Sequence, residues 1–110
     1  MAPRAFICGL KGTELSEEER AFLQETRPWG IILFKRNLDH PDQIRRLCRA
    51  ARTALERANA PILIDQEGGR VQRIGPPHVR AYPAGAVFGH LYAKNPLLGV
   101  EAARLGAKLI

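Results

Sequence analysis

The chain has 110 residues, which is enough for one domain with a single modest core and too few for two. Apolar residues make up 45% and charged residues 25%, a balance typical of globular rather than disordered chains. No apolar run approaches the roughly 18 to 20 residues that a membrane span needs. The few apolar residues between Arg4 and Lys11 are too short a run for a signal peptide, so we expect a cytoplasmic protein.

The chain is basic, with 17 Lys and Arg against 11 Asp and Glu and a formal net charge of +6. Two explanations are open for this charge: a solvated helix face, or a small basic module that binds nucleic acid. Five arginines fall in one predicted helix, and no aromatic residues are interleaved with them to stack on bases. These are Arg45, Arg46, Arg49, Arg52 and Arg57. The absence of such aromatic residues favours the solvated face.

The cysteines and histidines do not form a recognisable site. Cys8 and Cys48 have no second Cys or His at metal-ligand spacing, which argues against a zinc site and a disulfide framework. We expect both thiols to be small buried hydrophobic groups. His40, His78 and His90 are scattered along the chain and are interpreted as surface or loop-packing residues rather than catalysts.

The first predicted elements are a strand and a helix. Residues 5–10 are a short, mostly apolar run, which predicts a buried strand. Ser16 and Glu19 have the spacing of a capping box and predict a helix that begins there. We expect the helix to end near Thr26, because Pro28 disfavours helical geometry at the residue before it.

Two more strands and a second helix follow. Residues 30–34 are apolar on both faces, as in strands of a parallel sheet covered by helices. After the polar turn 35–40, Pro41 suits a first helical position, and apolar residues then recur every three or four positions until Asn59. Residues 61–64 are the third predicted strand.

The last third of the chain is less regular. Residues 68–83 are rich in Gly, Pro and Arg and predict a long irregular loop, and residues 84–90 predict a short turn of helix. A further helix begins near Pro96 and runs to the end of the chain. The alternation of strands and helices predicts a parallel α/β fold with right-handed crossovers. A closed eightfold barrel needs about 250 residues, so we expect a truncated chain.

One segment at the carboxyl end of a predicted strand combines acids, glycines and arginines. The third strand leads directly into Asp65, and Glu67 shares a face with it if the strand continues. The Gly pair 68–69 permits a tight turn, and Arg70 and Arg73 follow. A carboxylate and a guanidinium together can bind sugar hydroxyls, one accepting and the other donating. Alternatively, the acids cap a helix and the arginines neutralise them, in ion pairs that only hold the loop.

Residues 64–73, Ile-Asp-Gln-Glu-Gly-Gly-Arg-Val-Gln-Arg, resemble the signature of the β-N-acetylhexosaminidases of glycoside hydrolase family 3. Residues 30–37 and 12–20 are similar to other parts of the same family. The resemblance implies that residues 1–110 are the N-terminal part of a family 3 catalytic domain. It implies an α/β fold that is the N-terminal portion of a TIM-type (β/α) barrel, with about three βα units.

The resemblance also implies an activity. Such enzymes remove terminal non-reducing β-linked N-acetylglucosamine, with retention, from cell-wall (peptidoglycan) fragments during recycling in the bacterial cytoplasm. The implied substrate is an N-acetylglucosamine-containing muropeptide, and no cofactor, metal, nucleic acid or membrane is implied. A family relative that acts on another β-linked sugar, such as glucose, is the alternative within the family.

The site residues that the resemblance implies are few. Asp65 matches the carboxylate that hydrogen-bonds sugar hydroxyls in the subsite before the cleaved bond, and Arg73 matches a substrate-binding arginine. Arg70 is assigned a supporting role, orienting Asp65. The aspartate nucleophile and the histidine acid/base of the family have no counterpart here, so we expect no catalytic residue and no activity in these 110 residues alone. Cys8 departs from the family at a position where some members have an acid.

Overall fold

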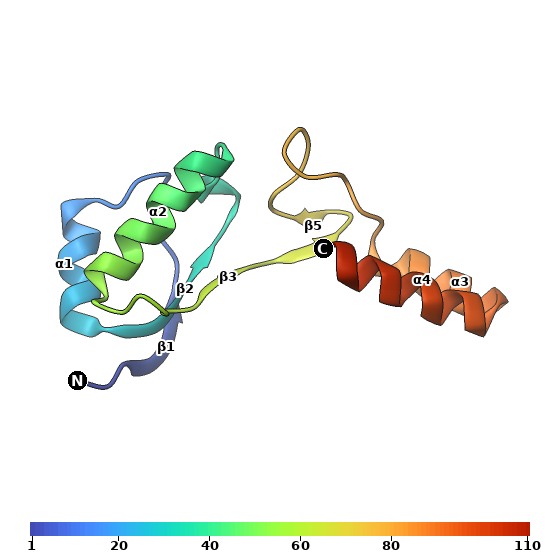
Figure 1. The fold of residues 1–110 in the computed structure, drawn as a ribbon, viewed down its shortest axis with the longest axis horizontal. Helices are drawn as coiled ribbons and strands as arrows, with labels where there is room; N and C mark the ends of the chain where they lie inside the picture. The colour runs from blue at the N-terminus through green and yellow to red at the C-terminus, as the bar shows by residue number, and fades with distance from the viewer. The chain divides into compact units, whose positions relative to one another are not determined.

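The computed structural model describes residues 1–110, which divide into two compact units, Met1–Ile64 and Asp65–Ile110 (Figure 1). We describe each unit by itself. The first contains a three-stranded sheet with two helices, and the second contains a small hairpin and a pair of helices.

The sheet of the first unit is parallel, with the strand order β1-β2-β3. Its strands are β1 (Arg4–Cys8), β2 (Pro28–Leu33) and β3 (Ile62–Ile64). All three predicted strands are confirmed, with ends displaced by one or two residues, but the prediction that the first strand is buried was wrong, because the residues of β1 are exposed or half-buried. Because the strands are parallel, their carboxyl ends meet at one edge of the sheet, where ligands bind in folds of this class.

Helix α1 (Glu17–Thr26) begins at the predicted capping box. The Ser16 hydroxyl accepts from the Glu19 N–H at 3.1 Å, and the Glu19 carboxylate accepts from the Ser16 N–H at 3.0 Å. The same carboxylate accepts a 2.7 Å hydrogen bond from the N–H of Lys11 and so ties the β1–α1 loop to the helix. The helix ends at Thr26 as predicted, and Arg27 then takes a left-handed conformation with φ 51°.

The Glu19 carboxylate makes the stability of this unit depend on pH. Partial burial alone would raise the pKa of Glu19, but the hydrogen bonds from Lys11 and Ser16 outweigh it and lower the pKa below its ordinary value of 4.5. A carboxyl with a lowered folded-state pKa stabilises the fold above its unfolded pKa, and this contribution is lost as the pH falls through the folded pKa. We expect the urea concentration at the unfolding midpoint to decrease when the pH is lowered below about 4.5. The same decrease should be smaller in Glu19→Gln, which has no carboxyl to protonate at this position. Equal losses in the two proteins would contradict this assignment.

Helix α2 (Pro41–Ala54) begins as predicted, with His40 as its N-cap, but it ends five residues before Asn59. The prediction of a helix to Asn59 was wrong because Glu56 takes a left-handed conformation, with φ 53°. The N–H of Glu56 donates to the Thr53 carbonyl and the N–H of Arg57 donates to the Arg52 carbonyl. These two bonds form a Schellman motif, which closes a helix. Such an ending usually has Gly at the left-handed position, and none is present here.

The core of the first unit lies between the sheet and the two helices, which pack against each other beside it (Figure 1). Its buried hydrophobic residues are Leu10, Leu23, Ile31, Leu33, Leu47, Ala51, Ala54, Leu55 and Ala60. Cys8 and Cys48 are half-buried and pack against this core, so the prediction of buried thiols is confirmed in part. Burial raises the pKa of both thiols.

The second unit begins with an antiparallel hairpin of β4 (Gln66–Gly68) and β5 (Val71–Gln72). The prediction of a fully irregular loop over 68–83 was therefore wrong in part. The predicted short turn near residue 84 is a ten-residue helix, α3 (Gly85–Lys94). Helix α4 (Pro96–Leu109) is confirmed, and the Asn95 side chain caps it. None of the helices in the chain is both long and apolar enough to cross a membrane.

Candidate functional site

The loops that follow β1 and β2 are joined by the buried side chain of Asn37, which is 0% exposed. Its Oδ1 accepts from the Phe34 N–H at 2.8 Å. Its Nδ2 donates to the carbonyl oxygens of Leu10 at 3.0 Å and Gly12 at 2.8 Å. One amide thus satisfies three backbone groups and fixes the two loops at the ligand edge of the sheet.

Gln43 extends the same network from the first turns of α2. Its Nε2 donates to the carbonyls of Thr13 and Asn37, at 2.8 and 2.9 Å, and its Oε1 accepts from the Asp39 N–H. Both amides are buried and satisfied, so they hold this edge rigidly. Asn37 lies in the predicted polar turn 35–40, and no role was predicted for either side chain.

The β4–β5 hairpin sets which residues stand opposite each other in the second unit. Gln66 pairs with Gln72, but Gly68 pairs with Val71, so a bulge of one residue lies between the two pairs. Continuing the Gln66–Gln72 register by one residue places Asp65 opposite Arg73. Without the bulge, the Gly68–Val71 register would continue along both strands and place Asp65 opposite Ile74 instead of Arg73. The bulge therefore selects Arg73 as the neighbour of Asp65.

The two glycines of the hairpin are required by their conformation and by a close approach of the chain. Gly68 has φ 89° and Gly69 has φ 62°, both in the left-handed region. The Gly69 N–H donates to the Tyr82 carbonyl at 2.8 Å. A Cβ on Gly68 would overlap the carbonyl oxygen of Pro83, and one on Gly69 would lie 2.7 Å from the Cβ of Ala84. The glycines thus allow residues 82–84 to pack against the hairpin.

The structure brings Asp65 and Arg73 together, as predicted for a pair that acts on one ligand. Asp65 follows the last residue of β3 directly, and its Oδ2 lies 3.5 Å from Nη2 of Arg73. The N–H of Arg73 also donates to the Asp65 carbonyl at 3.4 Å. The side chains are 42% and 28% exposed, so a ligand can reach both. A carboxylate accepts hydrogen bonds and a guanidinium donates them, so the two groups together suit a ligand that carries hydroxyls.

Glu67 and Arg70 are not part of the Asp65–Arg73 ion pair. The premise that β3 continues through Asp65 is wrong, because Asp65 separates β3 from β4, which pairs in another sheet. Glu67 is exposed in the bulged strand. Arg70 is exposed in the two-residue loop of the hairpin, and Arg73 rather than Arg70 makes the ion pair with Asp65.

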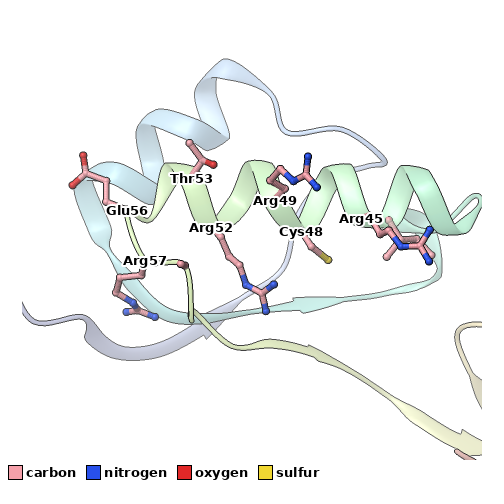
Figure 2. A pocket seen from close by; sticks show the side chains of 9 residues that line it. Arg45, Cys48, Arg49, Arg52, Thr53, Glu56 and Arg57 are labelled. Carbon is pink, nitrogen blue, oxygen red and sulfur yellow. The ribbon is translucent and has the colours of Figure 1, made fainter.

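A groove of about 780 Å³ runs along the arginine-rich side of α2 and the segment after it (Figure 2). Three of the five arginines have partners within this unit. Arg45 pairs with Asp42 at 2.6 Å, and Arg52 donates to the Ala60 carbonyl at 3.0 Å. Arg57 lies beyond the end of α2, contrary to the prediction, and donates to carbonyl oxygens of β2. Arg52 and Arg57 thus hold backbone carbonyl oxygens, whereas the exposed Arg45–Asp42 pair contributes little to stability.

Known proteins resemble the chain in sequence and in fold. The β-hexosaminidase of Alkalilimnicola ehrlichii is 47% identical over 90 residues, which are 82% of this chain and 25% of that protein. NagZ from Neisseria gonorrhoeae, in complex with N-trifluoroacetyl-D-glucosamine, matches with a TM-score of 0.85 at 30% identity. That match covers 97% of this chain and 32% of NagZ. A comparison with profiles of protein families gives no match.

A third relative is named as a member of glycoside hydrolase family 3. A glycoside hydrolase family 3 β-N-acetylglucosaminidase from Paenibacillus sp. matches with a TM-score of 0.67 at 32% identity, over 76% of this chain and 16% of that one. The chain spans about a quarter to a third of the length of the curated relatives it matches. The 110 residues therefore correspond to an N-terminal region of the β-hexosaminidases of glycoside hydrolase family 3.

Proposed function

We propose that residues 1–110 are the N-terminal part of a family 3 catalytic domain with a TIM-type (β/α) barrel. The parallel order β1-β2-β3, with a helix in each crossover, supports this fold. The likeness to NagZ over 97% of this chain supports it further.

The full-length protein is proposed to be a cytoplasmic β-N-acetylhexosaminidase. It removes terminal β-linked N-acetylglucosamine from peptidoglycan fragments, with retention and without a cofactor. The relatives named β-hexosaminidase and the NagZ complex with an N-acylated glucosamine support this activity. A retaining glycosidase needs a nucleophile and an acid/base beside the anomeric carbon. The family resemblance assigns neither role to residues 1–110, so both groups are proposed to lie outside this region.

Asp65 and Arg73 are proposed to bind hydroxyls of the N-acetylglucosamine ring, with Arg70 in a supporting role. The observation that carries this assignment is the half-exposed pair at 3.5 Å, joined directly to the carboxyl end of β3. The structural alternative, an ion pair that only holds the loop, is weaker for two reasons. The pair is partly open to solvent, which screens its contribution to stability. Neutral hydrogen bonds also hold this loop already, at Gly69, Gln66 and Gln72. Binding remote hydroxyls fixes the ring, so that binding energy lowers the barrier.

Hydrolysis of matched chromogenic glycosides tests the activity. We expect the purified full-length protein to release 4-nitrophenol from the β-N-acetylglucosaminide at least about tenfold faster, by kcat/KM, than from the β-glucoside. Proton NMR of the first product should show the β-anomer, as a retaining mechanism requires. A preference for the glucoside would favour the alternative sugar, and an α-anomer as first product would exclude retention.

A further inference from the structure

The side chains of Gln66 and Gln72 hold the chain that follows Arg73. The Gln66 Oε1 accepts from the Ile74 N–H at 3.1 Å, and its Nε2 donates to the Ile74 carbonyl at 2.8 Å. Both backbone groups of Ile74 are therefore bound by one amide, as they would be by a neighbouring strand. The Gln66 side chain thus extends the hydrogen bonding of the hairpin beyond the last backbone pair of the two strands.

Gln72 fixes the other side of the same segment. Its Nε2 donates to the carbonyls of Ile74 and Arg80, at 3.1 and 2.7 Å, and its Oε1 accepts from the Tyr82 N–H at 2.9 Å. The two glutamines face each other in the hairpin register. Together they connect the hairpin to residues 74–82 through neutral hydrogen bonds alone.

Arg73 lies between these two anchors. The residue before it, Gln72, contributes its side chain to the network, and the residue after it, Ile74, contributes its backbone. The Arg73 N–H donates to the Asp65 carbonyl at 3.4 Å, near the long limit of a hydrogen bond. Holding Ile74 therefore helps to fix the backbone from which the Arg73 side chain reaches Asp65.

We propose that Gln66 is a positioning residue that keeps Arg73 beside Asp65 by binding both backbone groups of Ile74, an inference that rests on the proposed sugar-binding role of this pair. Gln66 acts through Arg73 and does not touch the sugar. A long, flexible Arg side chain binds best when its backbone is fixed in advance, because less freedom is lost on binding. Misplacement by about 1 Å can cost about 100-fold in rate.

A double-mutant cycle in the full-length protein tests this proposal with the 4-nitrophenyl β-N-acetylglucosaminide. We expect Gln66→Leu to lower kcat/KM by about 10- to 100-fold. In an Arg73→Ala background the same change should cost less than about threefold, because the group that Gln66 positions is gone. A purely structural role would lower activity equally in both backgrounds. Gln24→Leu, the same change at an exposed position of α1, is the matched control and should leave kcat/KM unchanged.

If Gln66→Leu does not fold, the cycle is run with Gln66→Glu, which keeps the acceptor for the Ile74 N–H. Full additivity with Arg73→Ala, or no loss in the single variant, would overturn the positioning role alone. Unchanged activity in Arg73→Ala and Asp65→Ala would instead remove the sugar-binding pair, and this inference with it. The two failures are therefore distinguishable.

Discussion

Asp65→Ala in the full-length protein should lower kcat/KM for the 4-nitrophenyl β-N-acetylglucosaminide while the protein stays folded. A hydrogen bond to a charged group contributes about 1.5 to 3 kcal/mol. Each bond lost to a substrate hydroxyl therefore costs about 10- to 150-fold, since about 1.4 kcal/mol is tenfold. The total loss rises with the number of hydroxyls that the carboxylate binds. Asp65→Asn keeps one acceptor oxygen and should lose less activity than Asp65→Ala.

The chain offers a matched control for this prediction. Asp42 and Arg45 form another Asp–Arg ion pair, at 2.6 Å, with both side chains more than 70% exposed. Asp42→Ala removes the same chemical group from a helix surface and should leave kcat/KM unchanged. The thermal midpoints of Asp65→Ala and Asp42→Ala should both lie near that of the parent, because exposed pairs contribute little to stability. Normal turnover by Asp65→Ala would remove this residue from the site.

The elements that could be predicted from the sequence are those specified by neighbouring residues. The Ser16 and Glu19 capping box fixes the start of α1, and continuous apolar runs specify the parallel strands. The end of α2 could not be predicted, because Glu56 takes the left-handed position that Gly usually occupies. Strands of two or three residues, such as β4 and β5, are too short for alternation to show.

Only part of the candidate site could likewise be predicted from the sequence. The resemblance identified Asp65 and Arg73, but their proximity depends on a bulge of one residue in β4, which no local pattern reveals. The roles of Gln66 and Asn37 were not predictable, because each amide binds backbone groups that are distant in the sequence. Asn37 reaches carbonyls 25 and 27 residues before it. Such contacts exist only once the loops have been brought together by the sheet.

Asn37→Ala should be strongly destabilising, because it removes the amide that joins the loops after β1 and β2. The Leu10 carbonyl keeps a 2.9 Å hydrogen bond from Arg36 Nε, but the Phe34 N–H and the Gly12 carbonyl lose their side-chain partner. A fully buried polar group left unsatisfied costs about 1 to 3 kcal/mol. These two hydrogen bonds are part-buried, so we expect a total loss of about 2 to 3 kcal/mol. Urea unfolding of the variant and the parent measures this difference.

Asn59→Ala is the control, because Asn59 is exposed in the segment between α2 and β3 and the change is chemically identical. Its effect should stay within about 0.5 kcal/mol, as for most surface substitutions. Asn37→Asp should be worse than Asn37→Ala at pH 7, because it places a carboxylate against two carbonyl oxygens in a buried site. Lowering the pH should partly rescue Asn37→Asp but not Asn37→Ala, because a protonated carboxyl regains one donor. Equal stability of Asn37→Ala and Asn59→Ala would show that water replaces the lost amide, and the two loops would then need another connection.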